Sequence, residues 1–215
     1  MKRSVDLVMF DLDGTLADTG RDLAESVNYT RSQFDLASLA AHSVYRHIGR
    51  GVDHLLKHAI PELGRDHFEE VRHLFLRHYE QHLLDQTALY PGILKVLDDF
   101  SSKRRAVVSN KFYSLAVKLL KGLGVENCFD AIFGGDSAAD KKPDPALLHA
   151  ALTQFRLPAA RAVMVGDGDI DIEAGKRAGV MTCGVTYGLG DKNDLMAARP
   201  DVIINQPIEL GNYFV

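Results

Sequence analysis

Short apolar runs alternate with helical patterns through most of the second half of this chain. After about residue 90, five such runs are separated by segments long enough for helical crossovers between parallel strands. A sixth apolar run lies near the start of the chain. The pattern predicts an α/β fold with a doubly wound, Rossmann-like parallel sheet, whose strands lie at residues 5–10, 105–109, 131–133, 162–165, 181–185 and 202–204.

The region between residues 19 and 89 has a different character. It shows helical periodicity, contains no convincing strand, and holds eight of the nine histidines. We expect its longest helices at residues 18–35 and 65–85. The whole pattern predicts a small α-helical cap domain inserted after the first strand, with the domains divided into a core of residues 1–18 and 89–215 and a cap of residues 19–88.

Composition and charge narrow the class of protein. The chain has 215 residues, 46% hydrophobic and 25% charged, which is ordinary for a soluble globular protein. A formal net charge of -4 without a basic patch argues against nucleic acid or an anionic membrane as a partner. We expect neither a secretory leader nor a membrane span, because no apolar run approaches about 20 residues. Two isolated cysteines, Cys128 and Cys183, favour free thiols and a reducing, cytoplasmic location.

The first predicted strand ends in two carboxylates and a glycine, Asp11, Asp13 and Gly14. Side chains two residues apart in an extended segment point the same way, so both carboxylates could face one site while Gly14 permits a sharp turn. Two ionised carboxylates so close together need a cation, and Mg²⁺ is a hard, oxygen-seeking ion that suits them. Taken alone, the run is also compatible with a helix-capping turn or with part of a calcium loop.

Three further polar segments lie at or just beyond predicted strand ends, where open α/β sheets bind their ligands. They read Ser-Asn-Lys at residues 109–111, Lys-Lys-Pro at 141–143 and Gly-Asp-Gly-Asp-Ile-Asp at 166–171. With Asp-Leu-Asp-Gly-Thr at residues 11–15, they make the chain resemble the haloacid dehalogenase-like phosphohydrolase superfamily over essentially its whole length. Further details, at residues 11–19, 90–92, 109–111 and 142–145, are most similar to the phosphoglycolate phosphatase-like branch.

The resemblance implies roles for the acidic residues. Asp11 would attack phosphorus and form an aspartyl-phosphate, which divides one difficult displacement into two easier ones. Asp13 would protonate the leaving oxygen and then deprotonate the water that cleaves the intermediate. Mg²⁺ would be held by the Asp11 carboxylate, the main-chain carbonyl of Asp13 and Asp167. Asp171 would orient a metal-bound water or Lys142 rather than bind the metal directly.

The resemblance also implies which groups hold the transferring phosphoryl group. Ser109 would donate its hydroxyl to a phosphoryl oxygen, joined by backbone amides near Leu12, Asp13 and Asn110. Lys142 would neutralise charge on the nucleophile and on the phosphoryl group, since phosphoryl transfer depends mostly on positioning and electrostatics. The implied substrate is a small phosphorylated metabolite.

Several other charged residues have more than one interpretation. Lys141 competes with Lys142, which we favour because the family's lysine commonly stands directly before this proline. Asp169 is extra to the family pattern and is explained as a carboxylate favoured by the dipole at a helix N-terminus. Gly168 stands where the family often has Ser or Thr. Arg50 lies between two glycines, in a predicted turn with exposed backbone amides, and could reach a substrate carboxylate or be a solvated surface arginine.

Two histidine pairs in the predicted cap have the i, i+4 spacing of helical metal ligands, His54 with His58 and His78 with His82. No neighbouring carboxylate motif such as H-E-x-x-H accompanies them. Histidines that face solvent or a partner are therefore the favoured interpretation.

Alternatives to a phosphatase can be compared on the same residues. Asp13 argues against a haloacid dehalogenase, which would not be expected to carry an acid/base aspartate there. Lys57, the single lysine of the predicted cap, has surroundings unlike those in a phosphonatase. A β-phosphoglucomutase-like sugar-phosphate mutase shares all four motifs and stays open, as does, less favoured, a catalytically idle binding module. The leading hypothesis is an Mg²⁺-dependent phosphatase that hydrolyses a small phosphate monoester, with phosphoglycolate as the first candidate substrate. The sequence contains no signal that separates a monomer from a homodimer.

Overall fold

The computed structural model describes residues 2–215 and contains a six-stranded parallel sheet. Its strands are β1 (Leu7–Phe10), β4 (Arg104–Val108), β5 (Ala131–Phe133), β6 (Ala162–Gly166), β7 (Met181–Val185) and β8 (Val202–Ile204). Their order across the sheet is β5-β4-β1-β6-β7-β8. Each strand lies where the apolar runs predicted it, so the doubly wound parallel sheet is confirmed.

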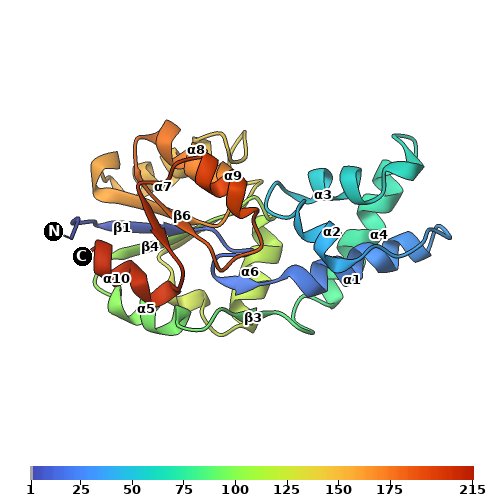
Figure 1. The fold of residues 1–215 in the computed structure, drawn as a ribbon, viewed down its shortest axis with the longest axis horizontal. Helices are drawn as coiled ribbons and strands as arrows, with labels where there is room; N and C mark the ends of the chain where they lie inside the picture. The colour runs from blue at the N-terminus through green and yellow to red at the C-terminus, as the bar shows by residue number, and fades with distance from the viewer. Residues whose placement is uncertain (1) are drawn as a thin grey trace.

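Helices cover both faces of this sheet (Figure 1). In β1, Leu7 and Met9 pack with one helical layer and Val8 and Phe10 with the other, and all four side chains are buried. A strand buried on both faces reads as a continuous apolar run rather than an alternating one, which is what the sequence shows. The first layer holds α7 (Ala146–Phe155) and α8 (Asp169–Ala178), and the second holds α5 (Ile93–Asp99) and α6 (Tyr113–Gly122).

Shorter elements complete the core. α9 (Lys192–Ala197) contacts α8, and α10 (Leu210–Tyr213) contacts α5. The ends of the chain meet beside the sheet, where Arg3 pairs with Phe214. The chain also forms short 3₁₀ turns: η1 (Pro61–Leu63), η2 (Glu126–Cys128), η3 (Ala159–Arg161) and η4 (Pro207–Glu209).

Four helices lie apart from the sheet and form what we call the helical insert (Figure 1). They are α1 (Gly20–Ser32), α2 (Ala41–Tyr45), α3 (Val52–Ala59) and α4 (Phe68–Gln81). The two long helices predicted here are present, but both are shorter than predicted. The chain beyond α1 turns at Asp35, whose φ of 56° is left-handed and incompatible with a continuing helix. The domain boundaries at residues 18–19 and 88–89 stay a prediction.

The expectation that no strand lies between residues 19 and 89 was wrong at its final residues. β2 (Ala17–Asp18) pairs antiparallel with β3 (Ala88–Leu89), and Ala17 stands opposite Leu89. Strands of two residues are too short to show alternation, so only the pairing itself reveals them. This two-stranded ribbon is where the chain leaves the sheet for the helical insert and where it returns.

The topology determines where a ligand can bind. The chain places β4 and β5 on one side of β1 and then returns to place β6, β7 and β8 on the other, so the order of strands reverses at β1. Open α/β sheets bind ligands beyond the carboxyl ends of the strands at such a reversal. In Figure 1 those ends point toward the helical insert. Within residues 2–215, no helix combines the length and the apolar character that crossing a membrane requires.

Asp22 anchors the insert to the returning chain, and its replacement by alanine should be costly. Its buried carboxylate accepts hydrogen bonds from the backbone amides of Gln86 and Thr87 and from the Thr87 hydroxyl, at 2.7–3.1 Å. Because Asp22→Ala strips those donors of their acceptor, we expect the free energy of unfolding to fall by about 2 to 4 kcal/mol in urea denaturation. Ser32→Ala, at an exposed position of the same helix, should change it by no more than about 0.5 kcal/mol. Equal effects of the two substitutions would contradict this anchoring role.

Candidate active site

Three buried carboxylates meet at the reversal of strand order. Asp11 follows β1, Asp167 follows β6, and Asp171 lies in the first turn of α8. The parallel pairing of β1 with β6 sets Phe10 beside Val165, so both strands deliver their aspartates to one place. One oxygen from each carboxylate lies within 4.8 Å of the other two. The site is therefore a compact carboxylate cluster.

Lys142 bridges two members of this cluster. Its ammonium nitrogen lies 2.8 Å from Asp11 Oδ1 and 2.7 Å from Asp171 Oδ1, and it also donates to the backbone carbonyl of Val108 at 2.7 Å. All three donors of the ammonium group are used, and the side chain is fully buried. Burial alone would lower the pKa of Lys142, but the charges of Asp11 and Asp171 raise it, so the lysine stays protonated. By contrast, Lys141 places its nitrogen over the ring of Phe112.

Asp167 is held by donors on both of its oxygens. Oδ1 accepts from the Thr15 hydroxyl at 2.9 Å, and Oδ2 accepts from the backbone amides of Leu189 and Gly190 at 2.9 and 2.8 Å. Gly14 has a φ of 87°, and a Cβ at this position would collide with the Asp167 carboxylate. The glycine of the first motif is thus required both by its backbone conformation and by the close approach of Asp167.

The cluster lacks positive charge. Three carboxylates face one ammonium group, which leaves two negative charges when all are ionised. Burial, followed by the charges of Asp171 and Asp167, raises the pKa of Asp11 to about 7 despite the opposing effect of Lys142. Burial and Asp171 likewise raise the pKa of Asp167 to about 6. An all-oxygen set with this charge deficit fits a divalent, oxygen-seeking cation.

Asp13 faces a different set of partners. Its Oδ1 accepts from the Thr19 hydroxyl at 2.7 Å and from the Lys111 ammonium at 2.9 Å. Lys111 also donates to the Tyr79 hydroxyl at 2.8 Å, so this ion pair reaches α4 of the insert. Burial alone would lower the pKa of Lys111, but the charge of Asp13 raises it. The Asp13 carboxylate is therefore outside the group of oxygens that could hold the cation.

Sequence reasoning assigned no role to Thr15, Thr19, Tyr79 or Lys111. Lys111, Thr15 and Thr19 all stand inside segments that carry the family resemblance, so their positions were available as signals. Tyr79 carried none, because only the folded chain brings it near Asp13.

Asn110 joins the core to the insert. Its side-chain amide donates to the backbone carbonyls of Lys142 at 2.9 Å and Gly49 at 3.0 Å, and its Oδ1 accepts from the Lys142 amide at 2.8 Å. Ser109 is buried directly after β4, the strand that pairs with β1. The predicted phosphoryl-binding residues thus come together at the ends of two adjacent strands.

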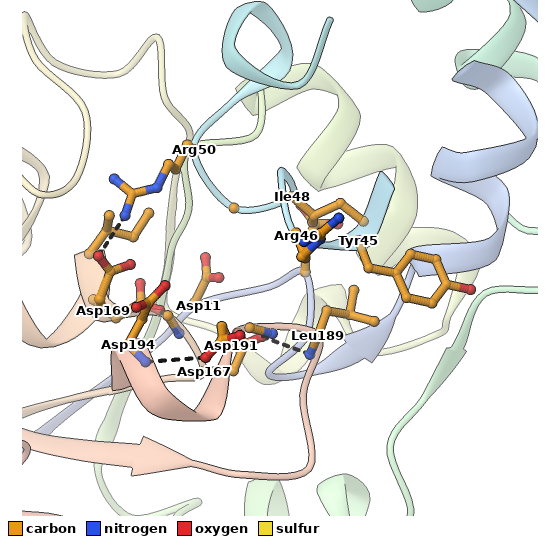
Figure 2. Close-up of a pocket in the computed structure, with 16 residues that line it drawn as sticks. Asp11, Tyr45, Arg46, Ile48, Arg50, Asp167, Asp169, Leu189, Asp191 and Asp194 are labelled. Atoms are coloured by element: carbon orange, nitrogen blue, oxygen red, sulfur yellow. Dashed lines mark hydrogen bonds and ion pairs between the residues drawn. The ribbon is translucent and has the colours of Figure 1, made fainter. Parts of the chain in front are cut away.

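A small pocket lies between the core and the insert. Figure 2 shows Tyr45, Arg46 and Ile48 of the insert to the right of the core aspartates and Arg50 above Asp169. Its volume is about 60 Å³, and a second hollow of about 30 Å³ lies between Asp13, Lys111 and the insert. Arg50 pairs with Asp169 at 2.5 Å across the pocket, and Asp169 is the first residue of α8, as predicted. In this arrangement, the Arg50–Asp169 ion pair connects the insert to the core at the edge of the pocket.

The fold and the site define the class of protein as an α/β enzyme with a lysine-bridged carboxylate at the end of its central strand and a helical insert above it. The family model described as haloacid dehalogenase-like hydrolase matches residues 8–185. The chain belongs to this family.

Individual relatives agree with this assignment. The chain is 35% identical to the phosphoglycolate phosphatase of Colwellia psychrerythraea over 204 residues, covering 91% of this chain and 90% of that protein. It is 36% identical to that of Aquifex aeolicus, covering 95% and 94%. The crystal structure of a predicted phosphoglycolate phosphatase from Haemophilus somnus superposes with a TM-score of 0.93 at 29% identity, covering 97% of each chain. The chain is therefore a hydrolase of the phosphatase class, on the phosphoglycolate phosphatase-like branch that its motifs predicted.

Stabilisation by Mg²⁺ should increase with pH. In the cation-free protein the pKa values of Asp11 and Asp167, about 7 and about 6, lie above the ordinary value of 3.8. Their contribution to stability is therefore complete below that value and is lost as pH rises through 6 and 7. A cation needs both carboxylates ionised, so we expect Mg²⁺ to raise the thermal unfolding midpoint by about 5 to 10 °C at about pH 8, at a hundredfold excess over Kd, and by much less at about pH 5.

The control for this measurement is Asp167→Asn in the same buffers, with EDTA as the cation-free reference. It should remove most of the Mg²⁺-dependent increase. An increase of the same size at both pH values, or one that survives in Asp167→Asn, would show that the cation binds elsewhere.

Proposed function

We propose that this protein is an Mg²⁺-dependent phosphatase that hydrolyses a small phosphate monoester through an aspartyl-phosphate on Asp11. Phosphoglycolate is the first candidate substrate. The observation that carries the proposal is the position of Asp11 at a pocket, held by Lys142 and with Asp167 beside it. Relatives named phosphoglycolate phosphatase, at 33–36% identity over most of the chain, support the substrate.

The carboxylates of Asp11 and Asp167 and the main-chain carbonyl of Asp13 would hold the Mg²⁺. When bound, this cation neutralises the charge that would otherwise repel an anionic phosphate from the Asp11 carboxylate. Asp171 acts on Lys142, since its Oδ1 accepts from the ammonium group and its Oδ2 from the backbone amide of Gly168. Asp171 therefore keeps Lys142 directed at Asp11.

In the first half-reaction an Asp11 oxygen forms a bond to phosphorus while the bond to the leaving oxygen breaks. Asp13 gives its proton to that oxygen, which keeps the electron pair. Ser109 and the amides near Leu12 and Asn110 hold the phosphoryl oxygens. In the second half-reaction, Asp13 takes a proton from the water that attacks phosphorus and releases phosphate from Asp11.

Lys111 positions Asp13. Its ammonium group contacts both carboxylate oxygens of Asp13, at 2.9 and 3.2 Å, which holds this carboxylate in one orientation at the pocket. The Tyr79 hydroxyl contacts the same nitrogen. Because Tyr79 belongs to α4, Lys111 links the insert directly to the acid/base residue Asp13.

The helical insert acts as the cap that excludes water from the reaction. It closes through the contacts Asn110–Gly49, Lys111–Tyr79 and Arg50–Asp169. The pocket of about 60 Å³ favours a substrate with few atoms beyond its phosphate. Arg50, released from Asp169, would supply the cation for a substrate carboxylate. A reducing compartment, the cytoplasm, is part of the proposal because Cys128 and Cys183 are both free thiols.

Replacing the nucleophile should abolish turnover. For Asp11→Asn, we expect phosphate release to fall by at least about a thousandfold, because an amide cannot form the covalent intermediate. The measurement is release of inorganic phosphate from phosphoglycolate, sugar phosphates, nucleotides and pyrophosphate, each with Mg²⁺ or with EDTA.

A preference for phosphoglycolate that needs both Mg²⁺ and Asp11 is the expected result. Asn205→Asp, a comparable substitution at an exposed position away from the pocket, should leave turnover unchanged. Turnover that survives Asp11→Asn would remove this residue as nucleophile. No release from any compound, with isomerisation of a sugar phosphate instead, would establish the mutase.

Asp13 and Lys111 should differ in the size of their effects. We expect Asp13→Asn to lower kcat by about 10² to 10⁴-fold, because it removes the proton donor and acceptor of both half-reactions. Lys111→Met should lower kcat less, by about tenfold, since Asp13 stays present but loses the contact that orients it. Lys118→Met, at an exposed position of α6, is the matched control. A Lys111→Met enzyme with an unchanged kcat would contradict the positioning role.

A further inference from the structure

Three histidines gather in the helical insert, outside the carboxylate cluster. His54 and His58 lie one turn apart on α3, and His47 approaches them from the loop between α2 and α3. One ring nitrogen from each histidine lies within 4.8 Å of the other two. The ring centroids are 4.1 Å apart for His54 and His58 and 4.8 Å apart for His47 and His58. The pair seen in the sequence thus gains a third imidazole from a different segment.

The hydrogen bond of His58 determines which of its nitrogens is available. Nδ1 of His58 lies 2.8 Å from the backbone carbonyl of His54. A carbonyl oxygen can only accept, so Nδ1 carries the hydrogen and Nε2 presents a lone pair in the neutral ring. Metal-binding histidines commonly donate their second ring nitrogen to a carbonyl in this way. The arrangement gives His58 the tautomer that a ligand needs.

Three other histidines of the insert have hydrogen-bond partners of their own. His78 pairs with the Ser26 hydroxyl, and His82 and His67 pair with Asp85 and Glu70. Within residues 2–215, the ring nitrogens of His47 and His54 make no hydrogen bond. In its neutral form each of these two rings carries a nitrogen lone pair that can bind a cation. These two rings therefore have lone pairs and no partner.

We propose that His47, His54 and His58 form a binding site for a divalent transition-metal cation, with Zn²⁺ as the ion that fits best. Imidazole nitrogens favour Zn²⁺ and its neighbours over Mg²⁺, and three histidines leave a fourth tetrahedral position for water. Zn–N bonds of about 2.0–2.1 Å require nitrogens roughly 3.4 Å apart. The exposed His58 and the loop position of His47 permit the small side-chain rotations that bring them closer.

Nearby positive charge limits the affinity of this site. Arg50, Lys57 and Arg46 act electrostatically on His54 or His47 and would repel a bound cation. We therefore expect a dissociation constant on the order of micromolar.

The site adjoins the active pocket. His47 stands between Arg46 and Ile48, and both of these residues line the pocket above the carboxylate cluster. A cation shared by His47 and α3 would tie this loop to the helix. The carboxylate cluster favours a hard cation such as Mg²⁺, and the three histidines favour a softer one such as Zn²⁺. The two sites would therefore select different ions by the type of their ligand atoms.

The test uses the untagged, full-length protein with saturating Mg²⁺, so that the carboxylate cluster is occupied. Co²⁺ is added first, and its visible absorption distinguishes tetrahedral nitrogen ligation from octahedral oxygen ligation. We expect a tetrahedral spectrum that one equivalent of Zn²⁺ removes. Loss of even an outer hydrogen-bond partner weakens metal affinity by roughly ten- to a hundredfold, so His54→Gln and His47→Gln should each weaken Zn²⁺ binding by at least about tenfold.

His82→Gln is the matched control, because His78 and His82 have the same i, i+4 spacing without a third histidine within reach. It should bind Zn²⁺ as the wild type does, and circular dichroism should show all variants folded. Absence of the tetrahedral Co²⁺ spectrum in the wild type would overturn the proposal. So would unchanged Zn²⁺ affinity in His47→Gln, because the site would then be the helical pair alone.

Discussion

The ammonium group of Lys142, buried between Asp11 and Asp171, is the interaction on which the site depends. Its three hydrogen bonds fill its donor capacity, and its single charge balances only one of three clustered carboxylates. Removing one partner of a buried pair leaves an uncompensated charge, so each member holds the others in place. Burial, together with the remaining charge deficit, raises the pKa values of Asp11 and Asp167, and the deficit explains why a divalent cation suits the site. Binding of the cation, protonation of the cluster and stability of the core are therefore linked properties.

This cluster can form because of the sheet topology. Reversal of strand order at β1 brings the ends of β1, β4 and β6 together, although their sequences are far apart. Asn110 then links the Lys142 backbone to the insert through Gly49, so the lysine is positioned both by its charge partners and by its main chain. Gly14 provides the close approach that Asp167 needs. Charge, backbone hydrogen bonding and close packing thus converge on one end of the sheet.

The helical insert connects to the core at three points and carries a histidine cluster of its own. Gly49 accepts from Asn110, Tyr79 reaches Asp13 through Lys111, and Arg50 reaches the rim of the pocket at Asp169. The proposed histidine site includes His47, which belongs to the same loop as Arg50. A cation bound there would therefore act on the segment that closes the pocket. Its chemistry is separate from that of the core, because nitrogen and oxygen ligands select different ions.

The sequence alone determined the six strands, the helical insertion and the four motifs at strand ends, because runs of buried apolar residues and adjacent carboxylates are local patterns. It also favoured Lys142 over Lys141. It could not reveal the pairing of β2 with β3, since two residues show no periodicity. Nor could it reveal Thr19 and Tyr79 beside Asp13, or His47 beside His54 and His58. Those contacts join segments whose separation along the chain says nothing about distance in space. Only the tertiary structure decided them, because burial and charge balance act between neighbours in space.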